Sequence, residues 1–509
     1  MPRLQNNTAS SKQITTTAPI VSLPDPDEAA VRSVDWSLSR RAFSLAVGSL
    51  ILAGCFALML VVGRIPVISE WLGDPEFFKR CLVVHVDLSL VVWFFGFAAA
   101  LYSLLPGTKR NHSIFHAGFS VALTGTVAMV AAMFVPGAPA ILSNYVPMLD
   151  HWLFIAGIVM LFSGLLICFM DGRLFSNDSE AEVTEIETAP GRLQWFRITP
   201  DIAAGFKTAA LAYVVAMTTF AISWFVTPRS LEARAYYELV FWGGGHVLQV
   251  ANVAAMLAVW LLLLSSLLRR QLLSKRTAWL LFGALLLPHL VAPLLTLQGT
   301  NTTLYRTGST RLMQFGIFPI VTIFLVICIR RIHAAFKAKQ IGAEAFRDPR
   351  FIGFAASVGL TVIGFLLGAM IRGSSTLIPA HYHASIGAVT VSFMAVTYVL
   401  LKPLGFSLPG FRLSRLAPAQ LYLFGIGQLV FALGFGWGGL FGLGRKAYGA
   451  EQHIRSVGEY IGVGVMAFGG LLAISGGLLF LFLVAWAGRP RISTTFSLFK
   501  MKYLTRSNA

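Results

Sequence analysis

The chain has 509 residues, a mean hydropathy of +0.72, 56% hydrophobic residues and only 12% charged residues, with a formal net charge of +18. A soluble domain of this length does not have such a composition, so the soluble classes of protein are excluded. The positive charge does not indicate binding of nucleic acid, because the sequence provides no soluble basic face to contact it.

Apolar runs of about 20 residues, enough to cross about 30 Å of hydrocarbon, recur along the whole chain. Apolar and polar residues do not alternate within them, as they would in the strands of a membrane barrel, so the runs indicate helices. The sequence therefore predicts an all-α, polytopic membrane protein with twelve transmembrane helices. We place these helices at about residues 41–63, 78–105, 115–137, 148–171, 203–227, 237–267, 277–299, 312–331, 351–371, 378–401, 418–441 and 457–486.

The remaining segments are predicted to lie outside this membrane domain, which spans residues 37–488. Residues 1–36 are polar and rich in Ser, Thr and Pro, so we expect a disordered tail, too polar to be a cleaved signal peptide. The acidic stretch at 178–192 is expected to be a solvated loop, and residues 489–509 a basic tail.

Lysine and arginine residues are distributed unevenly over the two ends of the predicted helices. If the N-terminus is cytoplasmic, one side collects "SRRAF", "GTKRNH", "LRRQLLSKR", "IRRIHAAFKAKQ", the 402–415 loop and the C-terminal tail. The positive-inside rule then predicts a multi-pass protein of the cell (inner) membrane with both termini in the cytoplasm.

Five of the ten histidines lie at helix ends or in loops, where solvated or structural roles are expected. These are His112, His116, His151, His333 and His453. The four cysteines are scattered singly, and no CxxCH or paired-cysteine motif for covalent haem, copper or iron–sulfur is present.

The other five histidines fall inside apolar runs, where a polar ring is costly unless it has a partner. Four of them lie in the first third of helices that run from the outer surface to the cytoplasm: His85, His246, His381 and His383. The fifth, His289, lies in the second half of a helix that runs the other way. The five rings are therefore expected in one layer near the outer surface. A shared layer of metal or haem is the economical explanation, with neutral imidazole as the ligand.

His381 and His383 cannot face the same partner. At about 100° per residue, positions i and i+2 point to nearly opposite sides of a helix. We therefore expect this helix to contact two different partners.

These motifs resemble those of the catalytic subunit I of the haem–copper oxidase superfamily, which includes oxygen reductases and nitric oxide reductases. The matching stretches are "CLVVHVDLSLVVW" in the second helix, "FWGGGHVLQVAN" in the sixth, "LLLPHLVAP" in the seventh and "PAHYHASIG" in the tenth. The stretch "HVDLSLVVWFFGFAAALYSL" also resembles cytochrome c oxidase subunit I. The resemblance covers residues 40–487 and implies the twelve-helix fold of that family.

The resemblance also implies cofactors. His85 and His383 would be the two axial ligands of a low-spin haem b, and His381 the single ligand of a high-spin haem whose other face is open to substrate. His246 and His289 would hold a second metal, non-haem iron or copper, over that face. Arg445 and Lys446 in "GLGRKAYG" resemble the basic pair beside the haem propionates, although a role in snorkelling or topology is equally open.

Two departures from the family bear on the second metal and on the substrate. Leu290 follows His289 where the family has a second histidine, so Gln249, Asn252, an acid or water would have to complete the metal site. The tyrosine that oxygen reductases use beside this metal is also missing, because Val250 stands at its position in the sixth helix and the seventh helix has no Tyr. We therefore expect the chain to be poorly equipped for four-electron reduction of oxygen.

The positions of the acidic residues favour reduction of nitric oxide over reduction of oxygen. The acids Asp87, Glu238 and Glu459 lie toward the outer side, where they would form a proton path, and the cytoplasmic halves of the helices lack such groups. Uptake of protons from outside without pumping suits reduction of nitric oxide to nitrous oxide. Gln249 stands near the place of the glutamate usual in nitric oxide reductases.

The sequence thus predicts an oxidoreductase of the respiratory chain that reduces a diatomic gas, with NO as the first choice. A divergent oxidase that reduces O2 to water remains an alternative. A haem electron carrier or gas sensor without the second metal is another. Electrons would arrive from a subunit II-like partner with a cupredoxin (CuA) or cytochrome c domain, and membrane lipid surrounds the rest.

Overall fold

The computed structural model describes residues 34–62, 75–176, 183–189, 192–406, 410–445 and 454–488. The predicted tails therefore lie outside the described residues, apart from their junctions with the membrane domain. In the described part of the chain, twelve helical segments are long and apolar enough to cross a membrane, which confirms the expected polytopic all-α architecture.

The first six segments of the bundle contain the following elements. They are α1 (Trp36–Val62), α3 (Pro75–Asp87) continued by η1 (Leu88–Val92) and α4 (Trp93–Tyr102), α5 (Lys109–Ala132), α6 (Trp152–Phe169) followed by η2 (Gly172–Phe175), α7 (Pro200–Val226) and α8 (Ala233–Leu268). The last six segments are α9 (Lys275–Leu286) continued by η3 (Leu287–Val291) and α10 (Ala292–Leu297), α11 (Thr303–Lys337), α12 (Pro349–Ala369), α13 (Leu377–Leu400), α14 (Gly410–Leu440) and α15 (Val457–Ala487), with the short η4 (Ala343–Arg347) before α12.

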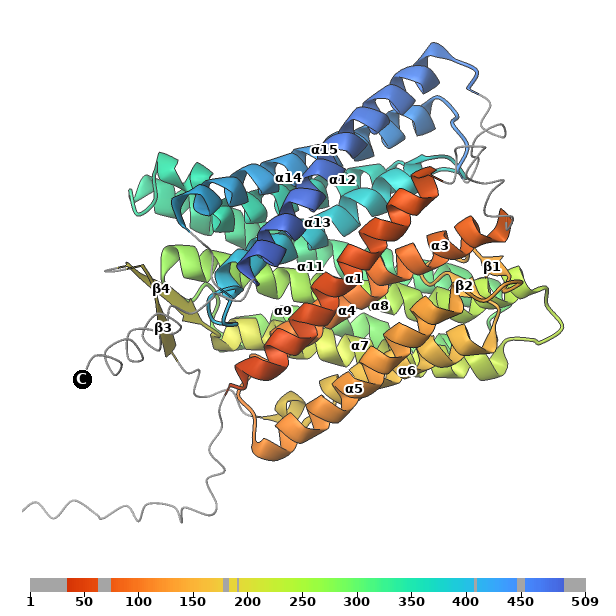
Figure 1. Cartoon of the computed structure of the whole chain (residues 1–509), viewed down its shortest axis with the longest axis horizontal. Helices are drawn as coiled ribbons and strands as arrows, with labels where there is room; N and C mark the ends of the chain where they lie inside the picture. Colours follow the sequence, from red (N-terminus) through yellow and green to blue (C-terminus); the bar gives the residue numbers. More distant parts are fainter. Residues whose placement is uncertain are drawn as a thin grey trace, which may run out of the picture.

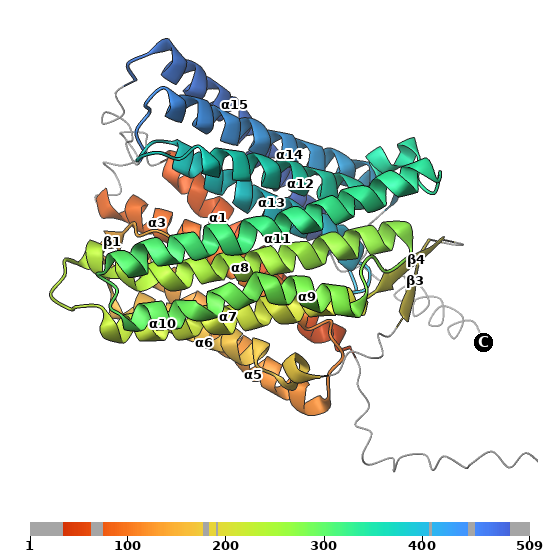
Figure 2. The ribbon, with the colours of Figure 1, turned by 180° about the vertical axis from the view of Figure 1, so that it is seen from behind.

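The helices lie side by side in one bundle, with α1 beginning and α15 ending at the same end (Figure 1). We call this the terminal end. The opposite end, where α3, α8 and α13 begin and α10 finishes, is called the histidine end. Seen from behind, α7, α9, α10 and α11 cover α8 (Figure 2).

Burial separates the central helices from the peripheral ones. In the most apolar stretch of each segment, 89% of the residues of α8, 78% of those of α13 and 72% of those of the α3–α4 segment are buried. The other segments are buried over half of that stretch or less. The three central segments carry His246, the pair His381 and His383, and His85, so ionisable groups lie where protein rather than lipid surrounds them.

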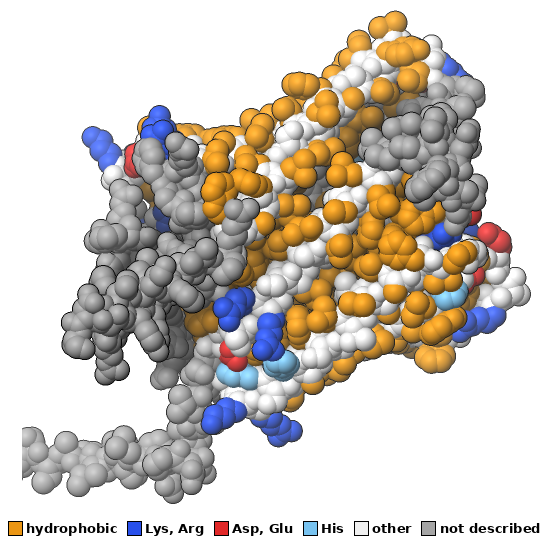
Figure 3. All heavy atoms as spheres, viewed as in Figure 1, with side chains coloured by type: hydrophobic (Ala, Val, Ile, Leu, Met, Phe, Trp, Pro, Cys, Tyr) orange, Lys and Arg blue, Asp and Glu red, His pale blue; other side chains and the backbone are white. Residues whose placement is uncertain are grey.

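The surface in view is apolar across the middle of the bundle, and the lysines and arginines gather toward its two ends (Figure 3). Such a band fits the hydrocarbon layer of a membrane. Together with the twelve apolar helices it identifies an integral membrane protein.

Two short antiparallel hairpins accompany the helices. β1 (Ala140–Ile141) pairs with β2 (Met148–Leu149) in the connection between α5 and α6, at the histidine end. β3 (Val183–Ala189) pairs with β4 (Arg192–Arg197) at the terminal end. The stretch 178–192, predicted to be a solvated loop, thus includes a strand, because "VTEIETA" contains β-branched residues that favour one.

Candidate metal centre

Four of the five membrane histidines are anchored in the same way, through a hydrogen bond from ring Nδ1 to a backbone carbonyl oxygen. The Nδ1–O distances are 2.8 Å from His85 to Ala53, 2.7 Å from His246 to Trp242, 3.0 Å from His289 to Leu285 and 2.7 Å from His381 to Gly364. A carbonyl oxygen only accepts, so Nδ1 carries the proton and Nε2 has its lone pair available. Metal-binding histidines are oriented by such bonds.

His85 and His383 stand on central helices that pack on each other deeper in the bundle. Below His85, the α4 residue Phe97 stacks on Phe393 of α13, with ring centroids 4.6 Å apart, and Trp93 meets Phe393 edge to face at 6.1 Å. Trp93 lies eight residues beyond His85 and Phe393 ten beyond His383, which is about 12 and 15 Å along each helix. The two histidines therefore share the space on the histidine-end side of an aromatic contact.

His383 is held by rings rather than by a hydrogen bond. Its imidazole lies parallel to the ring of Phe435 with centroids 5.6 Å apart, and meets Phe431 edge to face at 4.9 Å. His381, two residues earlier, turns instead toward α12 and bonds to Gly364. This confirms that the two rings of the HxH motif face different neighbours, as the helical period requires.

His246 and His289 lie near enough to each other to interact electrostatically. His289 lies on the 3₁₀ segment η3, whose second residue is the proline of "LPHLV". Its Nε2 is buried and has no hydrogen-bond partner in the described part of the chain. The next residue, Leu290, is 46% exposed on the outside of the bundle, so the position of the family's second histidine does not face this site.

The glycine that faces His289 explains how the ring fits. A Cβ atom on Gly316 of α11 would come within 2.4 Å of Cε1 of His289. Gly368 of α12 has the same relation to His381, with Nδ1 2.8 Å from the hypothetical Cβ. Close approach of neighbouring helices through glycine thus makes room for both imidazoles.

Tyr145 is a functional candidate that the sequence did not reveal. It lies in the turn between β1 and β2, and its phenol oxygen is 2.9 Å from Nε2 of His246. Burial raises the pKa of the Tyr145 phenol, and the nearby Glu238 carboxylate raises it further, so the phenol is neutral and donates this bond. A phenol that the sixth and seventh helices do not supply is thus placed beside His246 by a loop.

The same turn links two other predicted residues. The backbone N–H of Asn144 donates to Glu238 at 2.9 Å, and its side-chain amide donates to the other carboxylate oxygen of Glu238. Arg445 donates in turn to the side-chain oxygen of Asn144 at 3.0 Å. Glu238 and Arg445 are therefore brought together beside Tyr145, whereas Lys446 lies outside the described residues.

The other predicted acids differ in their surroundings. Asp87 is fully buried, and neither of its carboxylate oxygens has a partner in the described chain. It is followed at once by the π-helical η1, a type of distortion frequent at functional sites. Glu459, in contrast, forms a capping box with Ser456 at the start of α15, which accounts for its carboxylate structurally. Gln249 lies half-buried one turn after His246.

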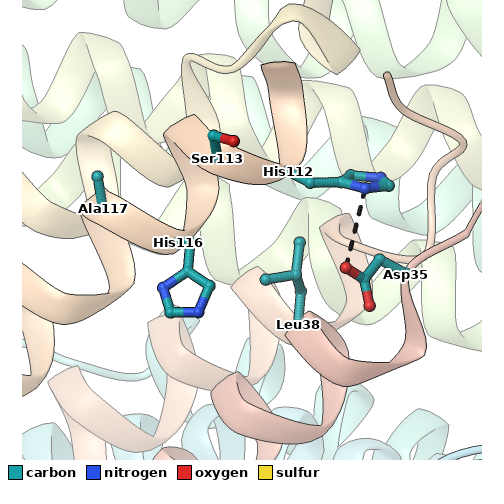
Figure 4. A pocket seen from close by; sticks show the side chains of 6 residues that line it. All are labelled: Asp35, Leu38, His112, Ser113, His116 and Ala117. Atoms are coloured by element: carbon teal, nitrogen blue, oxygen red, sulfur yellow. Dashed lines mark ion pairs between the residues drawn. The ribbon is translucent and has the colours of Figure 1, made fainter. Parts of the chain in front are cut away.

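Histidines outside this layer have local roles. His151 caps α6 through Leu153, with an N–N distance of 3.3 Å. His112 lies 3.8 Å from Asp35 across a surface pocket of about 420 Å³ at the terminal end, where His116 also points (Figure 4). His453 lies outside the described residues.

The donors fit haem at two positions. His85 and His381 each present an Nε2 for which the described residues supply no partner, opposite an anchored Nδ1. For a second metal, the described ranges contain no group of three or more His, Cys, Asp or Glu side chains able to hold an ion. His246 and His289 fit as two of its ligands, and any third must be of another type.

The chain is similar in sequence to three known proteins. No protein-family model matches the chain. It is similar to an uncharacterized protein of Aquifex aeolicus, 27% identical over 72% of this chain and 84% of that one, and to the uncharacterized protein RP382 of Rickettsia prowazekii, 25% identical over 88% and 95%. It is also 22% identical to cytochrome c oxidase subunit 1 of Thermus thermophilus, over 77% of this chain and 72% of that one.

The fold is that of the haem–copper terminal oxidases. A cryo-EM structure of a heme-copper terminal oxidase dimer matches with a TM-score of 0.64 and 18% sequence identity, over 90% of this chain and 84% of that chain. The resemblance expected from the four histidine motifs is thereby confirmed.

Proposed function

We propose that the protein is a membrane-bound haem oxidoreductase that reduces a diatomic gas at its histidine end, with nitric oxide as the substrate and nitrous oxide as the product. The observation that carries this proposal is the shared geometry of the anchored histidines, each with Nδ1 bonded to a backbone carbonyl oxygen, which leaves the lone pair on Nε2. Hydrogen bonds from Nδ1 to a carbonyl oxygen fix the tautomer that binds metal through Nε2.

In this proposal His85 and His383 hold the low-spin haem b, and His381 holds the high-spin haem. When bound, a six-coordinate haem transfers electrons and a five-coordinate haem binds a gas. His246 and His289 hold the second metal beside the gas, with Gln249 close by. The Phe431 and Phe435 rings keep the His383 imidazole in place and exclude water from its surroundings.

Proton supply supports nitric oxide as the substrate. Glu238 and Asn144 form a hydrogen-bonded pair at the histidine end, beside the Tyr145 phenol that contacts His246. These groups can hold and pass a proton from that side of the membrane, and Asp87, two residues beyond His85, is a buried carboxyl. Two NO, two electrons and two protons give one N2O and one water, so this reaction does not need the four electrons that reduction of O2 to water requires.

Reduction of O2 is the second candidate, and one observation favours it. Tyr145 supplies the phenol beside His246 that the helix sequences lack. The printed name of the Thermus relative, cytochrome c oxidase subunit 1, also agrees with this candidate.

In either case electrons are proposed to come from a membrane-anchored subunit with a cupredoxin (CuA) or cytochrome c domain. Arg445, beside Asn144, marks the face where this partner docks and where the haem carboxylates are neutralised. We propose that this face lies on the outer side of the cell membrane and that both termini lie in the cytoplasm.

The test is turnover by the purified protein with an artificial electron donor. We expect NO consumption with one N2O formed per two NO, and much slower O2 uptake. Faster O2 uptake would assign the oxidase function instead. Haem with turnover of neither gas would identify an electron carrier or sensor, and a colourless protein would contradict the proposal.

A further inference from the structure

The second metal lacks a third protein ligand of the usual kinds. Catalytic metal sites of this type generally use three protein ligands and leave further positions open. His246 and His289 provide two imidazoles, and no third His, Cys, Asp or Glu joins them within the described ranges. Tyrosine is outside that set of donors, so a phenol ligand remains to be considered.

Tyr145 is placed where a third ligand would be. Its oxygen is 2.9 Å from Nε2 of His246, the nitrogen that is left for a metal because Nδ1 bonds to Trp242. Two donor atoms bound side by side to one ion at about 2.0–2.1 Å lie about 2.9 Å apart when the angle between the bonds is near 90°. The observed separation therefore suits two ligands of one metal as well as a hydrogen bond.

The backbone conformation of Tyr145 costs free energy. Its φ of 67° is in the left-handed region, which is unfavourable for a residue with a large side chain. Strained backbone of this kind is frequent at functional sites. The ring also lies against Gly245, where a Cβ would come within 2.4 Å of Cγ of Tyr145.

The loop around Tyr145 is tied down on both sides. The backbone N–H and side chain of Asn144 bond to Glu238, and the Ser143 hydroxyl donates to the carbonyl of Val146 at 2.5 Å. The β1–β2 pairing closes the turn. The phenol is therefore presented to His246 by a built structure rather than by a free loop.

His289 completes the set of donors. Its Nε2 is buried without a partner in the described chain, and its ring is within electrostatic range of His246. Gly316 of α11 lies against Cε1 of the ring, where a larger residue would displace it. An unpartnered buried nitrogen beside a histidine–phenol pair is an observation that points to a bound ion.

We propose that Tyr145 is the third protein ligand of the second metal, with His246 and His289, and that the resulting site of two nitrogens and one oxygen selects iron. This deepens the proposed function, on which it rests. A hard oxygen donor beside two imidazoles resembles the donor types of non-haem iron sites more than those of copper. Binding of the ion displaces the phenol proton, for which Glu238, bonded to the neighbouring Asn144, is the acceptor.

The experiment compares Tyr145→Phe with Tyr237→Phe as the matched control. Tyr237 is also buried at the histidine end, but its hydroxyl donates to Asp150 at 2.9 Å and not to His246. Metal content per chain and the visible spectrum of the oxidised protein are measured for each. We expect the wild type and Tyr237→Phe to contain one non-haem iron and to show iron(III)–phenolate charge-transfer absorption.

In Tyr145→Phe we expect the charge-transfer absorption to disappear and the affinity for the non-haem iron to fall at least about tenfold, with the haem bands unchanged. Unchanged iron content and absorption in Tyr145→Phe would overturn the proposal. An increase in bound metal would also overturn it, because the phenol would then be a competitor for His246.

A second pair of variants guards against misfolding of the first. Gly245→Ala pushes the Tyr145 ring away and should also lose the absorption, whereas Gly244→Ala meets the ring of Phe220 instead and should retain it. A wild type with haem but without a second metal would refute this inference and leave the haem assignments standing. A wild type without haem would refute the proposed function itself.

Discussion

The two ends of the bundle differ in how a buried carboxylate is partnered. Near the terminal end, Arg173 forms an ion pair with Asp171, both fully buried, and Tyr102 donates to the same carboxylate at 3.1 Å. Near the histidine end, Nε2 of His289 and both oxygens of Asp87 have no partner among the described residues.

This difference separates structural from functional polar groups. A buried charge that is paired with an opposite charge holds the helices together, and the protein itself balances that charge. A buried donor or acceptor without a partner costs free energy, so its presence indicates a ligand, a metal or a proton. The predictions below test whether the two ends really differ in this way.

The largest expected effects come from the helix α13 ligands. His381→Ala should remove the high-spin haem signal and abolish gas turnover, because the open iron loses its only protein ligand. His383→Ala should instead remove the low-spin signal. The spectra of the reduced and gas-bound protein distinguish the two losses.

His333→Ala, at the exposed end of α11, is the control and should change neither signal. Equal loss of both haems in each α13 variant would contradict the assignment of one haem to each ring.

A large effect on stability, but not on cofactor identity, is expected at the terminal end. Asp171→Asn leaves the Arg173 charge buried without its counter-charge, which should cost about 3–5 kcal/mol of unfolding free energy. Thermal unfolding in detergent measures the loss.

The matched variant Asp35→Asn removes a half-exposed carboxylate near His112 and should change stability by at most about 1 kcal/mol. If the folded Asp171→Asn protein lost a haem instead of stability, the contrast between the two ends would not hold.

The smallest effects are expected when either of two glycines on neighbouring helices is replaced by alanine. Gly316→Ala would displace the His289 ring and should reduce second-metal content with the haems retained. Gly283→Ala, in α9, meets nothing within 4 Å and should stabilise the helix by about 0.5–1 kcal/mol. Metal analysis and thermal unfolding are measured on both variants, and a loss of metal in Gly283→Ala would show that α9 is sensitive to any substitution.

The sequence predicted much of the fold for a simple physical reason. Crossing a membrane requires long apolar helices, so the hydropathy pattern predicts the twelve segments and their order. The HxH spacing likewise requires His381 and His383 to face different neighbours, because the helical period is local. Boundaries were less accurate, as α8 and α11 extend beyond the predicted runs through their polar ends.

The sequence alone therefore determined the bundle and the histidines that a metal centre can use, since both follow from patterns along single helices. The tertiary structure decided which groups meet across the loops. It brought Tyr145 from the β1–β2 turn to His246, joined Glu238 to Arg445 through Asn144, and committed Glu459 to a helix cap. Such contacts depend on the path of a turn and on glycines that permit close approach, and neither has a period that can be followed along the chain.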